Sequence, residues 1–524
     1  MSRQAWLALA LLAAGLPGPA GATGFTDIGQ DLEQRAETEV EVHGALRLRG
    51  ELLYNLDLDR GVDPAGEPLY PVPPGDPTGQ LLTNVDMRLR TDLSLFVPRA
   101  QLAVKLRVDV LDNLGLGSDP SGPPVGTVSQ EAPELAFRVK RAYGEVLLPF
   151  GLLAAGRLGS HWGLGMLTNG GDCADCDSGD ASDGLALMSP LLGHVLALAY
   201  TFSSTGPFTD RRSDSRFLDL EPSDDVRTFT LALLKFHNDQ ARERRRQADR
   251  TSFEYGLYAS YRWQDNDIPA GYLSLARPES LGPGSVMARG LQALALDLWL
   301  RLTLPRFRLE LEGAVMLAEI EEPSLVPGAL LREPVYARQF GLALESEYGA
   351  PEDDWGVGLD AGFASGDPAP GFNAFPQLDD TAGQPGALRG AQARPPYDNR
   401  FDDFRFHPDY RVDRILFREL IGTVTDAVYV RPHARYRLLQ VGQGELVAQL
   451  SAVASFAVEP ASTPGGERPL GVELDPTLAY VNELGFQVVA DYAVLFPLGG
   501  LDNPAQGLSA KPAQLFQVRL AYGF

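Results

Sequence analysis

The strongest constraint on the fold is a strict two-residue alternation in the last stretch of the chain, Ala513–Phe524 (AQLFQVRLAYGF). One parity is apolar and ends on aromatic residues: Phe516, Val518, Leu520, Tyr522 and Phe524. A period of two places alternate side chains on opposite faces of a β-strand. The stretch is therefore predicted to be a strand with one apolar face. It would belong either to a membrane barrel or, alternatively, to an ordinary soluble sandwich.

The same alternation recurs in runs of about 10–15 residues, whereas strands of soluble proteins average about 5–6. Further runs begin near Val85, Leu102, Phe253, Phe307 and Phe486. In residues 40–58 the apolar members are Val40, Val42, Leu46, Leu48, Leu52, Tyr54, Leu56 and Leu58. Such long strands need one face in an apolar medium and one in water, which favours a barrel that spans a membrane.

The connections between these runs alternate between short joints and long Gly/Pro/Asp-rich stretches, of which 366–422 is the longest. The tight joints lie near 98–99, 149–151, 189–193, 305–306, 349–353 and 441–445. Outer-membrane barrels have short periplasmic turns and long extracellular loops. The prediction is an all-β, antiparallel up-and-down transmembrane barrel of about 18 strands, with 16 as the alternative. The arginine-rich joint 237–250 is too long for a tight turn and is predicted to be a small periplasmic excursion.

The chain is predicted to be exported. Residues 1–22 have the pattern of a secretory signal, with Arg3, an apolar run and an A-x-A site at Ala20-Gly21-Ala22. Residues 23–39 form a short polar segment and residues 40–524 the barrel, so the expected surroundings are outer-membrane lipid and lipopolysaccharide. The net charge of −24 argues against nucleic acid as a partner, since a phosphate backbone attracts basic surfaces.

A barrel of about 16–18 strands is wide enough to leave an aqueous lumen. The inward parity is strongly charged, and the two signs are unevenly distributed. The candidate basic pore-lining residues are Arg47, Arg49, Arg88, Arg90, Lys105, Arg107 and Arg519. The candidate acidic ones are Asp297, Glu310, Glu312, Glu345 and Asp360. Facing arcs of opposite charge would orient and select solutes. The alternative is that these charges are solvated and paired between neighbouring strands.

The stretch 170–184 (GGDCADCDSGDASDG) places several aspartates around the only two cysteines of the chain. Cys173 and Cys176 are expected to form a local disulfide in an oxidising compartment. Asp175, Asp177 and Asp180 are candidate calcium ligands, because calcium takes several carboxylate and carbonyl oxygens. Their spacing does not match an EF-hand, and the alternative is a solvated acidic loop. No other cofactor is expected.

Several motifs resemble known outer-membrane barrels. The terminal Phe524 resembles the closing aromatic that the barrel-assembly machinery reads in Gram-negative barrels. The motifs at 141–145, 162–166, 364–367 and 408–425 resemble an uncharacterised barrel family of myxobacteria-like deltaproteobacteria and, more loosely, alginate-export-type porins. The resemblance implies a channel whose long loops fold inward, with 366–422 narrowing the pore. It carries over no ligand residue.

Together these features predict a porin-like outer-membrane channel for passive diffusion of small hydrophilic solutes, with a lean towards anionic or sugar-like ones. The alternative is a non-conducting barrel that acts as a surface scaffold or receptor through acidic loops that bind ligands or cations. The chain has no serine-hydrolase elbow, zinc-protease motif or phosphate loop, so no enzymatic activity is expected. Because general porins are usually trimers, a homo-oligomer is a further expectation.

Overall fold

The computed structural model describes residues 37–524 except 75–79, 118–135, 208–218, 220–221, 269–283, 285, 325–327, 331–332, 373–383, 390–398 and 483. The predicted signal segment 1–22 and nearly all of the polar segment 23–39 lie outside the described residues. Within the described ranges, none of the helices has both the length and the apolar character that a membrane span requires.

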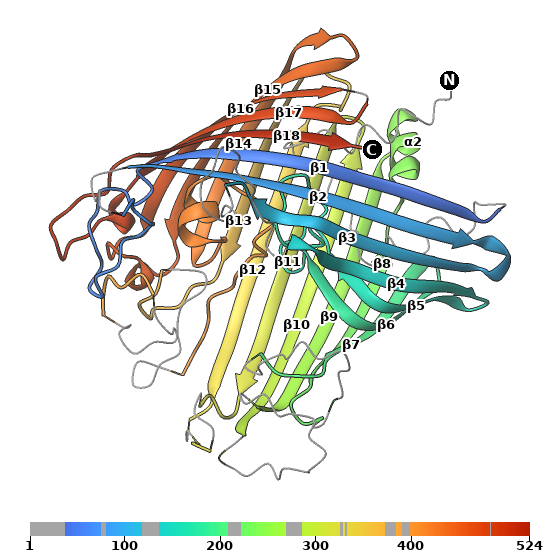
Figure 1. The fold of residues 1–524 in the computed structure, drawn as a ribbon, viewed down its shortest axis with the longest axis horizontal. Coiled ribbons are helices and arrows are strands. Elements are labelled where there is room, and N and C mark those ends of the chain that lie inside the picture. Colours follow the sequence, from blue (N-terminus) through green and yellow to red (C-terminus); the bar gives the residue numbers. More distant parts are fainter. Residues whose placement is uncertain are drawn as a thin grey trace, which may run out of the picture.

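The described strands form one closed barrel of 18 strands, in which each strand pairs antiparallel with its neighbours in sequence and β1 also pairs with β18 (Figure 1). The first nine are β1 (Glu39–Tyr54), β2 (Leu81–Val97), β3 (Leu102–Gly115), β4 (Arg138–Leu148), β5 (Gly151–Ser160), β6 (Asp180–Leu191), β7 (His194–Ser203), β8 (Val226–Lys235) and β9 (Ser252–Asp267). The others are β10 (Met287–Leu304), β11 (Phe307–Ile320), β12 (Val335–Tyr348), β13 (Trp355–Ala364), β14 (Ala427–Val441), β15 (Gly444–Ala457), β16 (Pro469–Asn482), β17 (Phe486–Pro497) and β18 (Ala513–Gly523). The predicted up-and-down barrel is confirmed, with 18 strands.

The barrel closes between β1 and β18, the strand formed by the alternating last stretch of the chain. Leu52 lies opposite Phe516, and Leu46 opposite Tyr522. The terminal residue is held by two backbone hydrogen bonds of 3.0 Å, Gly44 N to Phe524 O and Phe524 N to Gly44 O. Since the strand number is even, the start of β1 and the end of β18 lie at one end of the barrel together with the short turns. We call this the turn end, and the opposite end the loop end.

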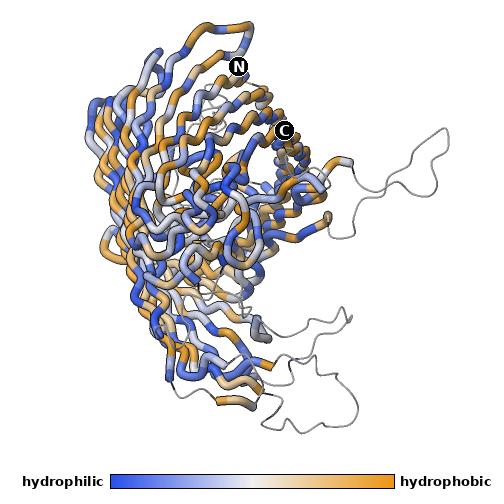
Figure 2. Tube along the Cα trace, turned by 90° about the vertical axis from the view of Figure 1, so that its left-hand side faces the viewer, coloured by the Kyte–Doolittle hydropathy of each residue, from blue (hydrophilic) through white to orange (hydrophobic). Residues whose placement is uncertain are grey.

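The outer surface of the barrel is apolar. Figure 2 shows hydrophobic and hydrophilic residues alternating along the strands. On β1, the side chains of Val40, Val42 and Leu52 are exposed, whereas those of Arg47 and Arg49 are buried on the other face. An apolar exterior with a charged interior is the arrangement of a barrel that sits in lipid. This is the architecture of an outer-membrane barrel.

The predicted alternation in residues 40–58 overran the strand. β1 ends at Tyr54, and Asn55 and Leu58 have left-handed backbone conformations, with φ of 57° and 59°. Leu56 and Leu58 are buried in an apolar cluster inside the barrel and do not face lipid. The prediction that these two residues belong to the lipid-facing side of a strand was wrong. An apolar residue at the right parity can lie against lipid or inside the protein, and the sequence pattern is the same in both cases.

The arginine-rich joint between β8 and β9 contains the helix α2 (Asp239–Gln247) at the turn end (Figure 1). Arg242 pairs with Glu254 at the start of β9 at 3.4 Å. Arg246 reaches Glu352 in the turn between β12 and β13 at 2.9 Å. Because β10 and β11 lie between these partners, the helix bridges part of the rim of the barrel.

Candidate functional site in the lumen

The predicted basic and acidic residues lie on opposite walls of the barrel. The basic residues are Arg519 on β18, Arg47 and Arg49 on β1, Arg88 and Arg90 on β2, and Lys105 and Arg107 on β3. The acidic residues are Asp297 on β10, Glu310 and Glu312 on β11, Glu345 on β12 and Asp360 on β13. β1 lies opposite β10 in the ring of 18 strands, so the two walls face one another.

The acidic wall carries its own counter-ions. Glu310 forms ion pairs of 2.7 Å with both Arg301 and Arg308. Asp360 pairs with Arg431 on β14 at 3.2 Å. Oppositely charged side chains on neighbouring strands stabilise a sheet locally. Much of the acidic wall is therefore neutralised within the sheet.

On the basic wall, arginines of one strand lie directly opposite arginines of the neighbouring strand. The strand register sets Arg47 against Arg88, Arg49 against Arg519, and Arg107 against Arg141. Like charges in directly opposed positions destabilise a sheet. Asp86, Asp92 and Asp109 on the same strands compensate part of this charge. The remaining counter-ions come from loops.

The connection between β5 and β6, residues 161–179, folds into the lumen; we call it the crossing loop. Its Asp175 is surrounded by guanidinium groups, with Arg49 at 3.3 Å, Arg519 at 3.0 Å, Arg414 at 2.9 Å and Arg418 at 2.5 Å. One carboxylate thus bridges the Arg49–Arg519 pair of the wall and two arginines from the longest loop.

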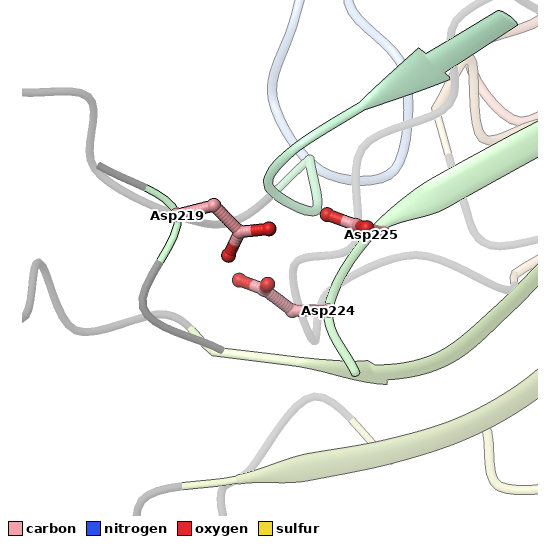
Figure 3. A group of neighbouring side chains, drawn as sticks. All are labelled: Asp219, Asp224 and Asp225. Atoms are coloured by element: carbon pink, nitrogen blue, oxygen red, sulfur yellow. The ribbon is translucent and has the colours of Figure 1, made fainter. Parts of the chain in front are cut away.

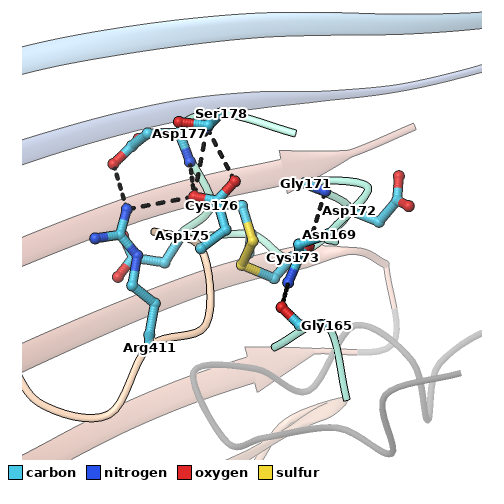
Figure 4. Close-up of a disulfide and its surroundings, with 12 residues drawn as sticks. Gly165, Asn169, Gly171, Asp172, Cys173, Asp175, Cys176, Asp177, Ser178 and Arg411 are labelled. Atoms are coloured by element: carbon cyan, nitrogen blue, oxygen red, sulfur yellow. Dashed lines mark hydrogen bonds and ion pairs between the residues drawn. A yellow bond between two sulfur atoms is a disulfide. The ribbon is translucent and has the colours of Figure 1, made fainter. Parts of the chain in front are cut away.

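Two more aspartates of the crossing loop meet the other arginine pairs. Asp177 lies 2.9 Å from Arg47 and 3.0 Å from Arg49, and Arg411 donates to it at 2.9 Å (Figure 4). Asp172 contacts Arg107, and Arg141 lies 3.0 Å from it. The acidic residues of this loop are therefore the counter-ions that the basic wall lacks.

The start of the crossing loop is bound to the acidic wall. Glu312 accepts hydrogen bonds from the backbone N–H groups of Leu164, of Met166 at 3.5 Å and of Leu167 at 3.1 Å. The indole N–H of Trp162 donates to Asp297 at 2.8 Å. The loop therefore spans the lumen from the acidic to the basic wall.

The tip of the crossing loop is closed by the disulfide between Cys173 and Cys176, seen in Figure 4. The three candidate calcium ligands do not converge. Asp175 and Asp177 face arginines, whereas Asp180 accepts from Thr168 at 2.7 Å and lies 3.4 Å from His407. Guanidinium groups repel a metal ion, so this arrangement opposes calcium binding at Asp175 and Asp177.

Part of the longest connection also lies inside the barrel; we call residues 403–426 the inner segment. Glu473 on β16 accepts from the backbone N–H groups of Arg414 and Ile415 at 2.8 Å and of Leu416 at 3.0 Å. Apolar side chains of the segment join Leu164 and Met166 of the crossing loop in one buried cluster: Phe404, Phe406, Val412, Ile415, Leu416, Phe417, Leu420, Ile421 and Val424. The two loops together form a packed plug in the lumen.

Another acidic group, which the sequence motifs do not indicate, lies between β7 and β8. Carboxylate oxygens of Asp219, Asp224 and Asp225 lie within 4.8 Å of one another (Figure 3). Asp225 also pairs with Arg227 at 3.1 Å. Adjacent aspartates are common in polar loops, so sequence spacing alone does not distinguish this group.

The loop carboxylates have shifted acidities. Burial raises the pKa of Asp175, but Arg418 and Arg519 outweigh it and hold this pKa well below its usual range. Burial also raises the pKa of Asp177, but the positive charge of Arg49 outweighs this effect, so the pKa of that carboxyl is lowered as well. A depressed folded-state pKa contributes stability above the unfolded-state value, and this stability is lost as the pH falls.

We therefore expect the plug to be labile to acid. The melting temperature of the refolded protein should be steady at neutral pH and should fall below about pH 4, where these aspartates start to take up protons in the unfolded chain. Thermal melts in detergent across this range measure the effect. A double variant, Asp175→Asn with Asp177→Asn, should show a shallower acid slope, and an unchanged slope would contradict the assignment.

No protein-family model and no curated protein matches the chain. Solved structures that resemble it include OccK9 (OpdG) of Pseudomonas aeruginosa, with 14% identity, a TM-score of 0.46, and 93% of this chain and 98% of that chain covered. OccK11 (OpdR) of the same organism has 12% identity, a TM-score of 0.42, and coverages of 92% and 96%. OmpT, an outer membrane protein of Vibrio cholerae, has 9% identity, a TM-score of 0.36, and coverages of 94% and 99%. The comparisons do not show the myxobacterial or alginate-export resemblance, and at these scores they carry no inference about a solute.

Proposed function

We propose that the protein is an outer-membrane channel for the passive diffusion of small hydrophilic solutes, and that its plugged lumen favours anionic ones. It is proposed to act without catalysis. Assembly through the strand that ends at Phe524, contact with lipopolysaccharide, and a homo-oligomeric state belong to the same proposal.

The observation that carries the proposal is the origin of the counter-ions on the basic wall. Arg49 and Arg519 are fixed on strands, whereas Asp175 belongs to a loop that enters from the loop end. A counter-ion on a loop can be displaced without breaking the barrel, because the strand ladder does not depend on it. Displacement of the crossing loop would expose a row of arginines along which a small anion can move.

The second candidate is a non-conducting scaffold or receptor barrel. It is favoured by the apolar character of the plug, since Phe404, Phe406 and Phe417 are almost fully buried inside the barrel. An ion cannot cross such a dry cluster while it stays packed.

Planar-bilayer recording of the refolded mature chain tests the proposal. We expect discrete conductance steps and a reversal potential in a salt gradient whose sign shows anion selectivity. The triple variant Arg88→Gln, Arg90→Gln, Arg107→Gln should lose much of that selectivity, because it removes charge from the basic wall. The control Arg306→Gln lies in a turn and should leave the selectivity unchanged.

A folded, heat-modifiable barrel that never conducts would reject the channel and support the scaffold. Conductance with the same ion selectivity in the triple variant would keep the channel but refute the role of the basic wall.

A further inference from the structure

A small cavity lies where the inner segment meets the connection between β15 and β16. Its polar lining comprises Asp403, Thr425 and Asp426 of the inner segment, and Ser462 and Thr463 of that connection. It has room for about one water-sized particle. The polar lining offers only carboxylate and hydroxyl side chains, which are oxygen donors of the kind that hard cations prefer.

Two of these oxygen atoms lack a hydrogen-bond partner in the described part of the chain, Asp403 Oδ1 and Thr425 Oγ1. Asp403 is only 2% exposed and Thr425 only 5%. A buried carboxylate oxygen without a partner is costly, and native proteins rarely leave one so. Both atoms belong to residues that line the same cavity, so one ligand there would satisfy both.

The neighbouring carboxylates of Asp367 and Asp426, unlike Oδ1 of Asp403, accept hydrogen bonds from the surrounding loops. Asp367 accepts from the backbone N–H groups of Ala369 at 2.9 Å and Asp402 at 3.0 Å. Asp426 accepts from Glu459 N at 2.8 Å and from the hydroxyl of Ser462. These bonds fix the cavity walls.

The charge around the cavity is unbalanced. The carboxylates of Asp367 and Asp426 lie close enough to Asp403 to repel its negative charge, and Arg405 opposes them as a neighbouring cation. A cation in the cavity would offset the repulsion between Asp403 and Asp426.

The close packing of the backbone around Asp426 indicates that the cavity is preorganised. A Cβ atom on Gly366 would overlap Asp426 Oδ1, so only glycine lets the chain after β13 pass this close to the carboxylate. The backbone pairs Arg405 with Thr425 in an isolated bridge, which places Asp403 and Asp426 on neighbouring stretches.

We propose that this cavity binds a divalent cation of the calcium type, with Asp403, Thr425 and Asp426 as side-chain ligands and Ser462 at its edge. The ion would join the inner segment to the connection between β15 and β16 and so hold the plug in place. The proposal does not depend on whether the barrel conducts. It assigns calcium to residues other than the aspartates of the crossing loop.

Calcium titration of the refolded mature chain, freed of metal by a chelator, tests the proposal. We expect saturable binding by calorimetry and a rise in melting temperature with Ca²⁺ that Na⁺ at equal ionic strength does not reproduce. Asp403→Asn keeps the shape of the side chain and should raise the dissociation constant for calcium by about tenfold or more. Thr425→Val removes one neutral ligand and should raise this dissociation constant by a smaller factor.

The matched control is the double variant Asp224→Asn, Asp225→Asn in the other acidic group, which should bind calcium as the unmodified chain does. If Asp403→Asn does not refold, Thr425→Val still tests the cavity. The proposal is overturned if calcium neither binds nor stabilises the unmodified chain. It is also overturned if both cavity variants bind normally, or if binding is lost only in the control.

Discussion

Replacing Asp175 with Asn is expected to lower the free energy of unfolding by about 3–5 kcal/mol, because it removes a buried carboxylate that four arginines share and leaves part of their positive charge uncompensated. Arg49, Arg414, Arg418 and Arg519 all lie within ion-pair distance of this carboxylate. Asparagine preserves the shape but not the charge, so the loss measures electrostatics and not packing. Urea unfolding of the refolded protein, followed by the mobility shift of the folded barrel, gives the difference.

The control for this experiment is Asp183→Asn. Asp183 pairs with Arg157 at 2.8 Å, but their side chains are 50% and 46% exposed. Exposed pairs contribute less than about 1 kcal/mol, so this variant should unfold almost as the parent does. Equal effects of the two substitutions would mean that Asp175 is hydrated and that the plug is not tightly packed.

Replacing the crossing loop with a short Gly-Ser turn between β5 and β6 is expected to raise the single-channel conductance severalfold. The loop spans the lumen between Glu312 and the basic wall, so its removal widens the path and lets water reach the arginines. Water around the arginines would then stabilise the positive charge that the lost aspartates had compensated. Planar-bilayer recording at fixed salt measures the change.

A milder variant, Glu312→Gln, separates loop displacement from loop removal. It weakens the acceptor for Leu164 and Leu167 while leaving the loop in the chain, so we expect more frequent transitions between conductance levels. An unchanged conductance after loop replacement, in a folded barrel, would show that the inner segment alone closes the pore.

The strands were predictable because each lies between lipid and a polar interior, and that boundary imposes the two-residue period on the sequence. Of the two strand numbers that the sequence allowed, 18 and 16, the barrel has 18. Leu56 and Leu58 show the limit of this reasoning, since an apolar plug attracts the same residue types as lipid does.

The sequence predicted which charged residues face the lumen, but not which charges lie next to one another. The alternation placed Arg47, Arg49 and Arg519 on the inner parity, but only the strand register shows Arg49 opposite Arg519. The counter-ion Asp175 is 126 residues from Arg49 in the chain. Local sequence patterns carry no information about a pairing at that separation.

The sequence by itself determined the barrel and the sign of each wall, and it narrowed the strand number to 16 or 18, because strand period and turn composition are local properties of the chain. Only the tertiary structure decided that the acidic cysteine loop crosses the lumen, and that Asp403 and Asp426 share a cavity with Thr425. The physical reason is that loops have no period. Their positions follow from burial of apolar groups and neutralisation of charge, and both depend on partners that are close in space but distant in sequence.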